Sequence, residues 1–294
     1  MVKADSAVWF VKYGVTCALL FTCCWAAPRV FKDIPQFPPT TTDEQQVVVF
    51  ERYFQLPAQD IVLVGSSLAF RLKEQFFEHS GVRNTALPGG SPLTALAIIE
   101  ASPALRPRVI AVESNILTRG IDDKLFQKFK DATRRDDTLR PLRSLAAYYQ
   151  SVQDDALTYD AARRRSILER PAATYDTEQG MANALVEWNR PIYGEEIWKG
   201  ASTLKSLVEK LEAQGVKIFF FDMPYPPKMN DSGYAATTRE ILGQVFGPGN
   251  DRWLKLDYPA SELRWFDAAH LDDRSAIIFS SALDDAIRKR MTAN

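Results

Sequence analysis

The sequence predicts an α/β protein, with a three-layer α/β/α domain built around a five-stranded parallel sheet. The first observation behind this prediction is that short apolar runs, typical of buried strands, alternate with longer amphipathic segments. The second is that the segments between the runs are long enough to form helices, which connect parallel strands through right-handed crossovers. The chain has 294 residues, enough for one large domain with a substantial core.

The predicted strands are short and rich in apolar residues. In chain order they lie at 61–64 (IVLV), 82–86, 108–114 (RVIAVES), 216–224 (VKIFFFDMP) and 252–258 (RWLKLDY). A helix is predicted after each strand except the third, where a long polar segment comes first, and these helices cover 68–79, 92–101, 200–215, 234–246 and 272–291. Gly215 follows the third of these helices, as expected for a residue that ends a helix.

The N-terminal residues 1–27 are predicted to form a signal anchor, an uncleaved transmembrane helix. Residues 6–27 are uncharged apart from Lys12 and have the length of a bilayer-spanning helix, about 20 residues. A cleaved secretory signal, with processing after Ala26, is the alternative. A lipoprotein signal at Cys23 is a weaker alternative, because no convincing lipobox precedes it. We expect the rest of the chain to lie outside the cytoplasm, on the periplasmic or extracellular face.

Two further regions are predicted after the anchor. Residues 28–57 form a proline- and threonine-rich stalk and a lead-in helix at 43–55. Residues 58–294 form the α/β domain, with a polar, largely helical insertion at about 118–200. The insertion is either a subdomain over the edge of the sheet or a solvated helical excursion with no role in binding.

The composition excludes several classes of function. The net charge is −1 and no basic run is interleaved with aromatic residues, which argues against nucleic-acid binding. The only cysteines are Cys17, Cys23 and Cys24, so the predicted domain holds neither a disulfide nor a thiolate metal site. There is no phosphate-binding loop and no dinucleotide fingerprint. We therefore expect no cofactor and no metal.

Residues suited to acyl transfer follow the predicted strands. Ser67 follows the first strand, Gly89 the second and Asn115 the third, while Asp267 and His270 follow the last. The carboxyl ends of parallel strands meet at one edge of a sheet, and ligands bind there in open α/β sheets. We therefore expect these residues to converge.

Each of these residues has a role in one mechanism. Ser67 is the candidate nucleophile, His270 the base that takes its proton, and Asp267 the acid that orients the imidazole. The N–H groups of Ser67 and Gly89 and the amide of Asn115 are candidate oxyanion donors. By itself, a Gly-Ser-Ser between a strand and a helix is more often a helix cap than a nucleophile.

Several other polar residues have simpler interpretations. Ser66 is expected to bond to the backbone of the turn. His79 is expected at the C-terminus of a helix, and Asp272 and Asp273 at the N-terminus of the last helix. The basic run 163–165 is expected to be a solvated face.

Four segments, in this order and at these strand ends, resemble the SGNH hydrolase superfamily, the GDSL-type esterases and acyltransferases. They are VGSSL, NTALPGGS, VESNI and DAAH. Ser67 stands at the nucleophile position and Ser66 where aspartate is usual, and the glycine that usually precedes Asn115 is missing. The resemblance covers about residues 58–118 and 214–290.

The resemblance implies a flavodoxin-like SGNH fold and a serine enzyme that acts through an acyl-Ser67 intermediate. Asp267 and His270 match the D-x-x-H of the last block, and Gly89 and Asn115 match the oxyanion positions of the second and third. The family contains both esterases and O-acyltransferases, so the acceptor is either water or a sugar hydroxyl.

The function expected from these features is addition or removal of an acyl group, such as acetyl, on a cell-surface or extracellular polysaccharide. The expected partners are an acyl donor, a glycan, the membrane and, for a transferase, a membrane protein that supplies the acyl group. The alternative is a non-catalytic accessory or glycan-binding subunit of an envelope polysaccharide assembly.

Overall fold

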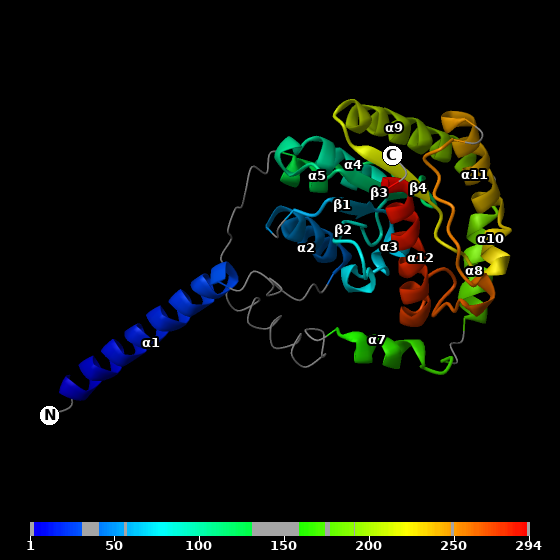
Figure 1. Cartoon of the computed structure of the whole chain (residues 1–294). Coiled ribbons are helices and arrows are strands. Elements are labelled where there is room, and N and C mark those ends of the chain that lie inside the picture. The colour runs from blue at the N-terminus through cyan, green and yellow to red at the C-terminus, as the bar shows by residue number, and fades with distance from the viewer. Residues whose placement is uncertain are drawn as a thin grey trace.

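A computed structural model describes residues 3–30, 41–55, 58–130, 159–173, 177–190, 192–247 and 250–292. Within these residues four strands form one parallel sheet in the order β2-β1-β3-β4 (Figure 1). The strands are β1 (Ile61–Val64), β2 (Val82–Asn84), β3 (Val109–Glu113) and β4 (Lys217–Phe221). The prediction of an α/β protein with a parallel sheet is confirmed.

The predicted fifth strand, at 252–258, does not form. This segment meets β4 in a single parallel bridge, between Phe220 and Trp253. The chain reaches β4 only after a turn at Asn250, and β4 ends one residue beyond Phe220, at Phe221, so the two segments hardly overlap. The prediction of five strands was therefore wrong, and the sheet has four in the part of the chain that the structure describes.

Helices and short 3-10 turns make up most of the remaining structure. The helices are α1 (Lys3–Val30), α2 (Thr42–Gln55), α3 (Ser67–Phe70), α4 (Pro92–Glu100), α5 (Asp123–Phe129), α7 (Ala161–Leu168), α8 (Glu178–Trp188), α9 (Tyr193–Ala213), α10 (Pro227–Asn230), α11 (Gly233–Phe246) and α12 (Asp273–Thr292). The 3-10 turns are η1 (Glu74–Phe76), η2 (Pro103–Leu105) and η3 (Ala260–Glu262).

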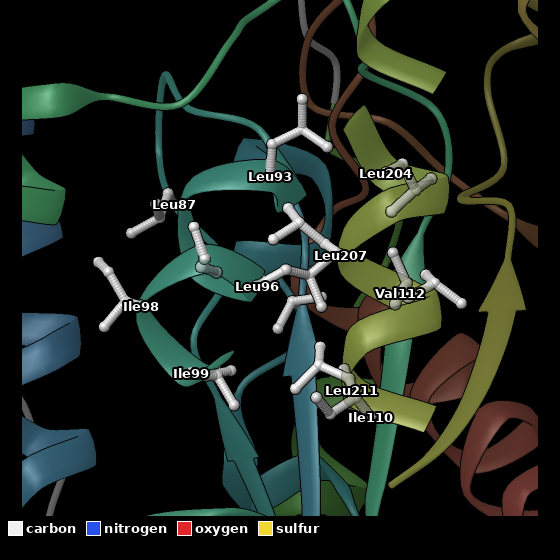
Figure 2. Packing of buried hydrophobic residues seen from close by; sticks show 14 of the residues in the cluster. Leu87, Leu93, Leu96, Ile98, Ile99, Ile110, Val112, Leu204, Leu207 and Leu211 are labelled. Atoms are coloured by element: carbon white, nitrogen blue, oxygen red, sulfur yellow. The ribbon is translucent and has the colours of Figure 1, made fainter. Parts of the chain in front are cut away.

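One face of the sheet packs against α4 and α9. Leu96 of α4 and Leu204 and Leu207 of α9 gather around Ile110 and Val112 of β3 (Figure 2). Each such side chain contributes about 1.5–3 kcal/mol when it is fully buried. Helix α2 adds a group of aromatic side chains to the same core, so the predicted lead-in helix is part of the packed domain.

The opposite face packs against α3 and α12. Leu63, Ala111 and Phe221 point to this side, because successive side chains of a strand alternate between the two faces. They meet Leu68 of α3 and Phe279 of α12. Helices therefore cover both faces of the sheet, which confirms the predicted three layers.

The predicted transmembrane segment forms a helix, α1, whose described apolar side chains, such as Trp9 and Phe10, are exposed. Yet nowhere in the described residues is there a helix whose length and apolar character suffice to cross a membrane. The predicted transmembrane helix is therefore not found. Most of the predicted stalk, residues 31–40, lies outside the described residues.

The prediction of a helix over residues 68–79 was wrong, because the helix that forms is much shorter. The chain forms only the single turn α3 and then the 3-10 turn η1. The side-chain amide of Asn84 ends α3 by donating to the carbonyl oxygens of Ala69 and Leu72, at 2.9 and 2.7 Å. His79 consequently does not end a helix, and its N–H donates to Asp284 at 2.9 Å.

The predicted insertion is described in part, as α5, α7, α8 and the start of α9. Helix α7 is attached to the domain, because Ile167 joins the core beside α12 and Arg164 binds Glu78 at 2.7 Å. Arg163 and Arg165 are exposed, as expected for a solvated face.

We predict that Leu204→Ala lowers the free energy of unfolding by about 2–5 kcal/mol, because it removes a fully buried side chain between α9 and β3. Urea unfolding of the full chain measures the change. Ser206→Ala, on the exposed side of the same helix, is the matched control and should change that free energy by less than about 0.5 kcal/mol. Equal effects of the two substitutions would contradict the packing described here.

Candidate active site

The candidate site lies at the carboxyl ends of β1 and β3. Strand β1 pairs with β2 on one side and with β3 on the other, so the strand order reverses between β1 and β3. Open α/β sheets bind ligands at such a reversal. The turn that follows β1 carries Ser66 and Ser67, and β3 ends beside them at Glu113.

The turn after β1 has room for glycine alone at position 65. A Cβ atom on Gly65 would lie 2.7 Å from both Ala69 Cβ and Glu113 Oε2. Ser66 is the N-cap of α3, and its Oγ accepts the N–H of Leu68 at 3.2 Å. Ser67 is consequently the first residue of α3, at the helix end where backbone N–H groups are free.

The structure brings Ser67, His270 and Asp267 into one hydrogen-bonded series. His270 Nε2 lies 2.9 Å from Ser67 Oγ. The other ring nitrogen of His270, Nδ1, lies 2.8 and 3.0 Å from the two carboxylate oxygens of Asp267. A hydroxyl, an imidazole and a carboxylate in this order can pass a proton from the serine to the histidine while the carboxylate stabilises the resulting charge.

Asp267 is held in place by its own loop. Its Oδ1 accepts the N–H groups of Ala269 and His270, at 2.8 and 2.7 Å. Partial burial raises the pKa of Asp267, but these bonds and the bond from the His270 ring outweigh burial and bring that pKa below its ordinary value. Asp267 is therefore ionised at neutral pH, as an acid that supports an imidazolium must be.

Contacts within the loop and with the segment after β4 position His270. Trp265 and Leu271 form an antiparallel bridge across the loop, and the indole N–H of Trp265 donates to the carbonyl of Pro224 at 3.1 Å. The ring of Phe266 stacks against His270, with centroids 5.7 Å apart.

Arg71, at the end of α3, fastens the same loop to the helix that carries Ser67. Its Nε donates to the carbonyl of Leu271 at 3.2 Å, and its Nη2 binds Asp273 at 3.1 Å. The guanidinium also lies 4.6 Å from the centre of the Phe266 ring. Arg71 thus links the helix that begins at Ser67 to the loop that carries His270.

Two of the predicted oxyanion donors have free N–H groups. In the part of the chain that the structure describes, the backbone N–H groups of Ser67 and Gly89 make no hydrogen bond. Gly89 has φ 68°, a left-handed conformation that favours glycine. Both groups follow strands at the same edge of the sheet, as expected for oxyanion donors. Their role as donors stays a prediction.

Asn115 is bound differently from the prediction. Its Nδ2 donates to the carbonyl of Met223 at 2.9 Å, and its Oδ1 accepts the N–H of Met223 at 2.7 Å. This pair of bonds ties the segment after β3 to the segment after β4. One amide hydrogen of Asn115 is therefore already in use, which the sequence pattern does not reveal.

Glu113 is the residue of the site that the sequence analysis missed. Its side chain is fully buried, and its Oε2 accepts the backbone N–H of Ser66 at 2.6 Å and the Ser66 hydroxyl at 2.7 Å. Burial raises the pKa of Glu113 to about 7, against the lowering effect of these bonds. The signal was a carboxylate at the end of an otherwise apolar strand, RVIAVE.

Other acidic residues near the site have structural partners. Asp272 accepts the N–H of Ser275 at 2.7 Å, at the start of α12, and Asp273 binds Arg71 and Lys73, in line with their interpretation as helix N-terminal residues. The described residues contain no group of three or more His, Cys, Asp or Glu side chains able to hold a metal ion.

The ionisation of Glu113 predicts how stability changes with pH. The pKa of Glu113 is 4.5 ordinarily and about 7 when buried, so between these values the folded protein holds a proton that the unfolded chain releases. The stabilisation is complete below about pH 4.5 and is lost as the pH rises through about 7. It amounts to roughly 3 kcal/mol, the free energy of the pKa difference.

Urea unfolding of the wild-type protein and of Glu113→Gln, at several pH values from about 4 to about 8, measures this change. The free energy of unfolding of the wild type minus that of the variant should fall as the pH rises. A difference that stays constant over this range would show that Glu113 is ionised in the folded protein throughout.

Comparisons of this chain with protein-family models, with curated proteins and with solved structures find no match. The chemistry of the site therefore has to be argued from its own geometry.

Proposed function

We propose that this protein is a serine esterase or O-acyltransferase that works through an acyl-Ser67 intermediate. One observation carries the proposal: Ser67 Oγ, His270 and Asp267 are joined by hydrogen bonds of 2.9 and 2.8 Å at the carboxyl edge of the sheet. A serine hydroxyl is a weak nucleophile unless a base takes its proton, and His270 is placed to do so.

In the first half of the proposed reaction, Ser67 Oγ attacks the carbonyl carbon of an ester while His270 Nε2 takes the hydroxyl proton. The C–O bond of the leaving alcohol then breaks, and the imidazolium returns the proton to the leaving oxygen. In the second half, water or a sugar hydroxyl gives its proton to His270 and attacks the acyl-Ser67 ester. Collapse of this second intermediate releases Ser67 with its proton restored.

The oxyanion of each tetrahedral intermediate is assigned to the free N–H groups of Ser67 and Gly89. Asn115 is retained as a third donor only through the amide hydrogen that Met223 does not take. Removal of one such donor in comparable sites costs about 10²–10³ in kcat.

The proposed fold is the flavodoxin-like SGNH type, because the strand order 2-1-3-4 corresponds to the start of the flavodoxin-like order. The proposed substrates are an acyl donor and a cell-surface or extracellular polysaccharide, with a membrane protein supplying the acyl group to a transferase. A location outside the cytoplasm belongs to the same proposal. These points rest on the sequence resemblance.

We predict that Ser67→Ala abolishes turnover of p-nitrophenyl acetate and labelling by a fluorophosphonate probe, because both need the Ser67 hydroxyl. Ser206→Ala, an exposed serine of α9, is the matched control and should leave both unchanged. Intact mass after exposure to an activated acyl ester should show one added acyl group, mapped to Ser67.

Labelling that survives in Ser67→Ala would contradict the proposal. Glycan binding by the wild-type protein without any Ser67-dependent turnover would instead favour the accessory, non-catalytic subunit.

We predict that Asp267→Asn lowers kcat for p-nitrophenyl acetate by about 10²–10⁴, because an amide neither fixes the imidazole tautomer nor stabilises the imidazolium. Steady-state kinetics of the full-length protein measures the loss. The control is Asp257→Asn, which removes an exposed carboxylate and should leave kcat within about twofold. A kcat for Asp267→Asn close to that of the control would exclude this role of Asp267.

A further inference from the structure

We propose that Glu113 is a positioning residue for Ser67: its buried carboxylate binds both the N–H and the hydroxyl of Ser66 and so fixes the turn that presents Ser67 to His270. This inference rests on the proposed function for its activity tests. Its structural content, a turn held by one carboxylate oxygen, stands on the geometry alone.

Two hydrogen bonds join Glu113 to the turn. Its Oε2 accepts from the Ser66 N–H at 2.6 Å and from the Ser66 Oγ at 2.7 Å, two bonds that converge on one oxygen. The same oxygen would lie 2.7 Å from a Cβ at position 65, so the missing side chain of Gly65 is what admits the carboxylate. The Ser66 hydroxyl also accepts the N–H of Leu68, so one hydroxyl links Glu113 to the first turn of α3.

The bonds that hold Ser66 also fix the position of Ser67. Ser67 follows Ser66 in the chain and is the first residue of α3. The base it must meet is also held by contacts outside this turn, from Asp267 and from the bond of Trp265 to Pro224. A turn that rotated would therefore move Ser67 Oγ away from a base that stays in place.

The charge of Glu113 determines the strength of the two hydrogen bonds that it accepts from Ser66. Hydrogen bonds to an ionised carboxylate are about twice as strong as bonds to a neutral one. Since Oε2 takes both bonds from Ser66, a proton would sit on Oε1, which makes no hydrogen bond among the described residues. Protonation would thus leave the contacts in place and weaken both.

The surroundings of Glu113 place this change of charge near neutral pH. Burial raises the pKa to about 7, the bonds from Ser66 lower it, and the negative charge of Asp222 at the end of β4 raises it. Tyr225 and Tyr234, the titratable groups that face it from the segment after β4 and from α11, are neutral in this range, because burial raises the pKa of each.

The test compares kcat and KM of wild type and Glu113→Gln for p-nitrophenyl acetate, using the full-length protein from about pH 5 to about pH 9. The amide keeps an oxygen acceptor but carries no charge at any pH. We expect kcat of the wild type to exceed that of the variant by about fivefold to tenfold above pH 7, where the carboxylate is ionised, with KM within about twofold. The ratio should approach one at low pH, where Glu113 is protonated.

The ratio removes any pH dependence that the two proteins share. Asp284→Asn is the matched control, because Asp284 is also a buried carboxylate that accepts a backbone N–H, from His79 at 2.9 Å. For this control the ratio should stay near one at every pH. A wild-type to Glu113→Gln ratio that does not change with pH would overturn the inference.

A second measurement needs no turnover. Hydrogen exchange of the segment 65–70, followed by mass spectrometry, should be faster in Glu113→Gln than in wild type or Asp284→Asn. Unchanged exchange overturns the inference even if the protein is not an esterase. If exchange is faster in Glu113→Gln but the wild type shows no Ser67-dependent turnover, only the proposed function is overturned. Should Glu113→Gln fail to fold, Ser66→Ala removes the hydroxyl's bond to Glu113 together with the bond that it accepts from Leu68. It should lower kcat about threefold and speed this exchange, and unchanged values would again overturn the inference.

Discussion

The site depends on the contact between two segments that are far apart in the sequence: the turn after β1 and the loop before α12. The hydrogen bond from Ser67 to His270 spans 203 positions, and by itself it is too weak to bring the segments together. Arg71 closes the distance by binding the carbonyl of Leu271 and the carboxylate of Asp273, and Trp265 ties the loop to the end of β4. The geometry of the triad is thus a product of the fold around it.

Most of the sheet could be predicted from the sequence, because β1, β3 and β4 are largely buried apolar runs, whereas β2 has only Val82 as an apolar residue. The errors occurred where tertiary contacts override local pattern. The apolar alternation at 252–258 is typical of a strand, yet that segment reaches β4 for a single bridge. The amphipathic pattern at 68–79 is typical of a helix, yet Asn84, from β2, takes the carbonyl oxygens that a continuing helix would use.

The triad positions could also be proposed from the sequence, since a serine follows the Gly turn after β1 and a D-x-x-H motif lies just before the last helix. Their supports could not. Glu113 looks like an ordinary strand-end residue until the missing side chain of Gly65 is seen to make room for it. Asn115 was expected to donate to an oxyanion, and only the packing of β3 beside β4 reveals that its amide is bonded to Met223. Such partners are set by distance in space, which spacing along the chain does not encode.

The long separation between the nucleophile and its base has a consequence for biosynthesis. A ribosome releases Ser67, its turn and Glu113 well before the imidazole of His270 and the loop that carries it, because these lie much later in the sequence. Until that last segment has docked against α3 and β4, the nascent polypeptide carries a serine with no proton acceptor beside it. The Ser67–His270 contact therefore cannot form until the later segment has been made and has packed against the earlier one.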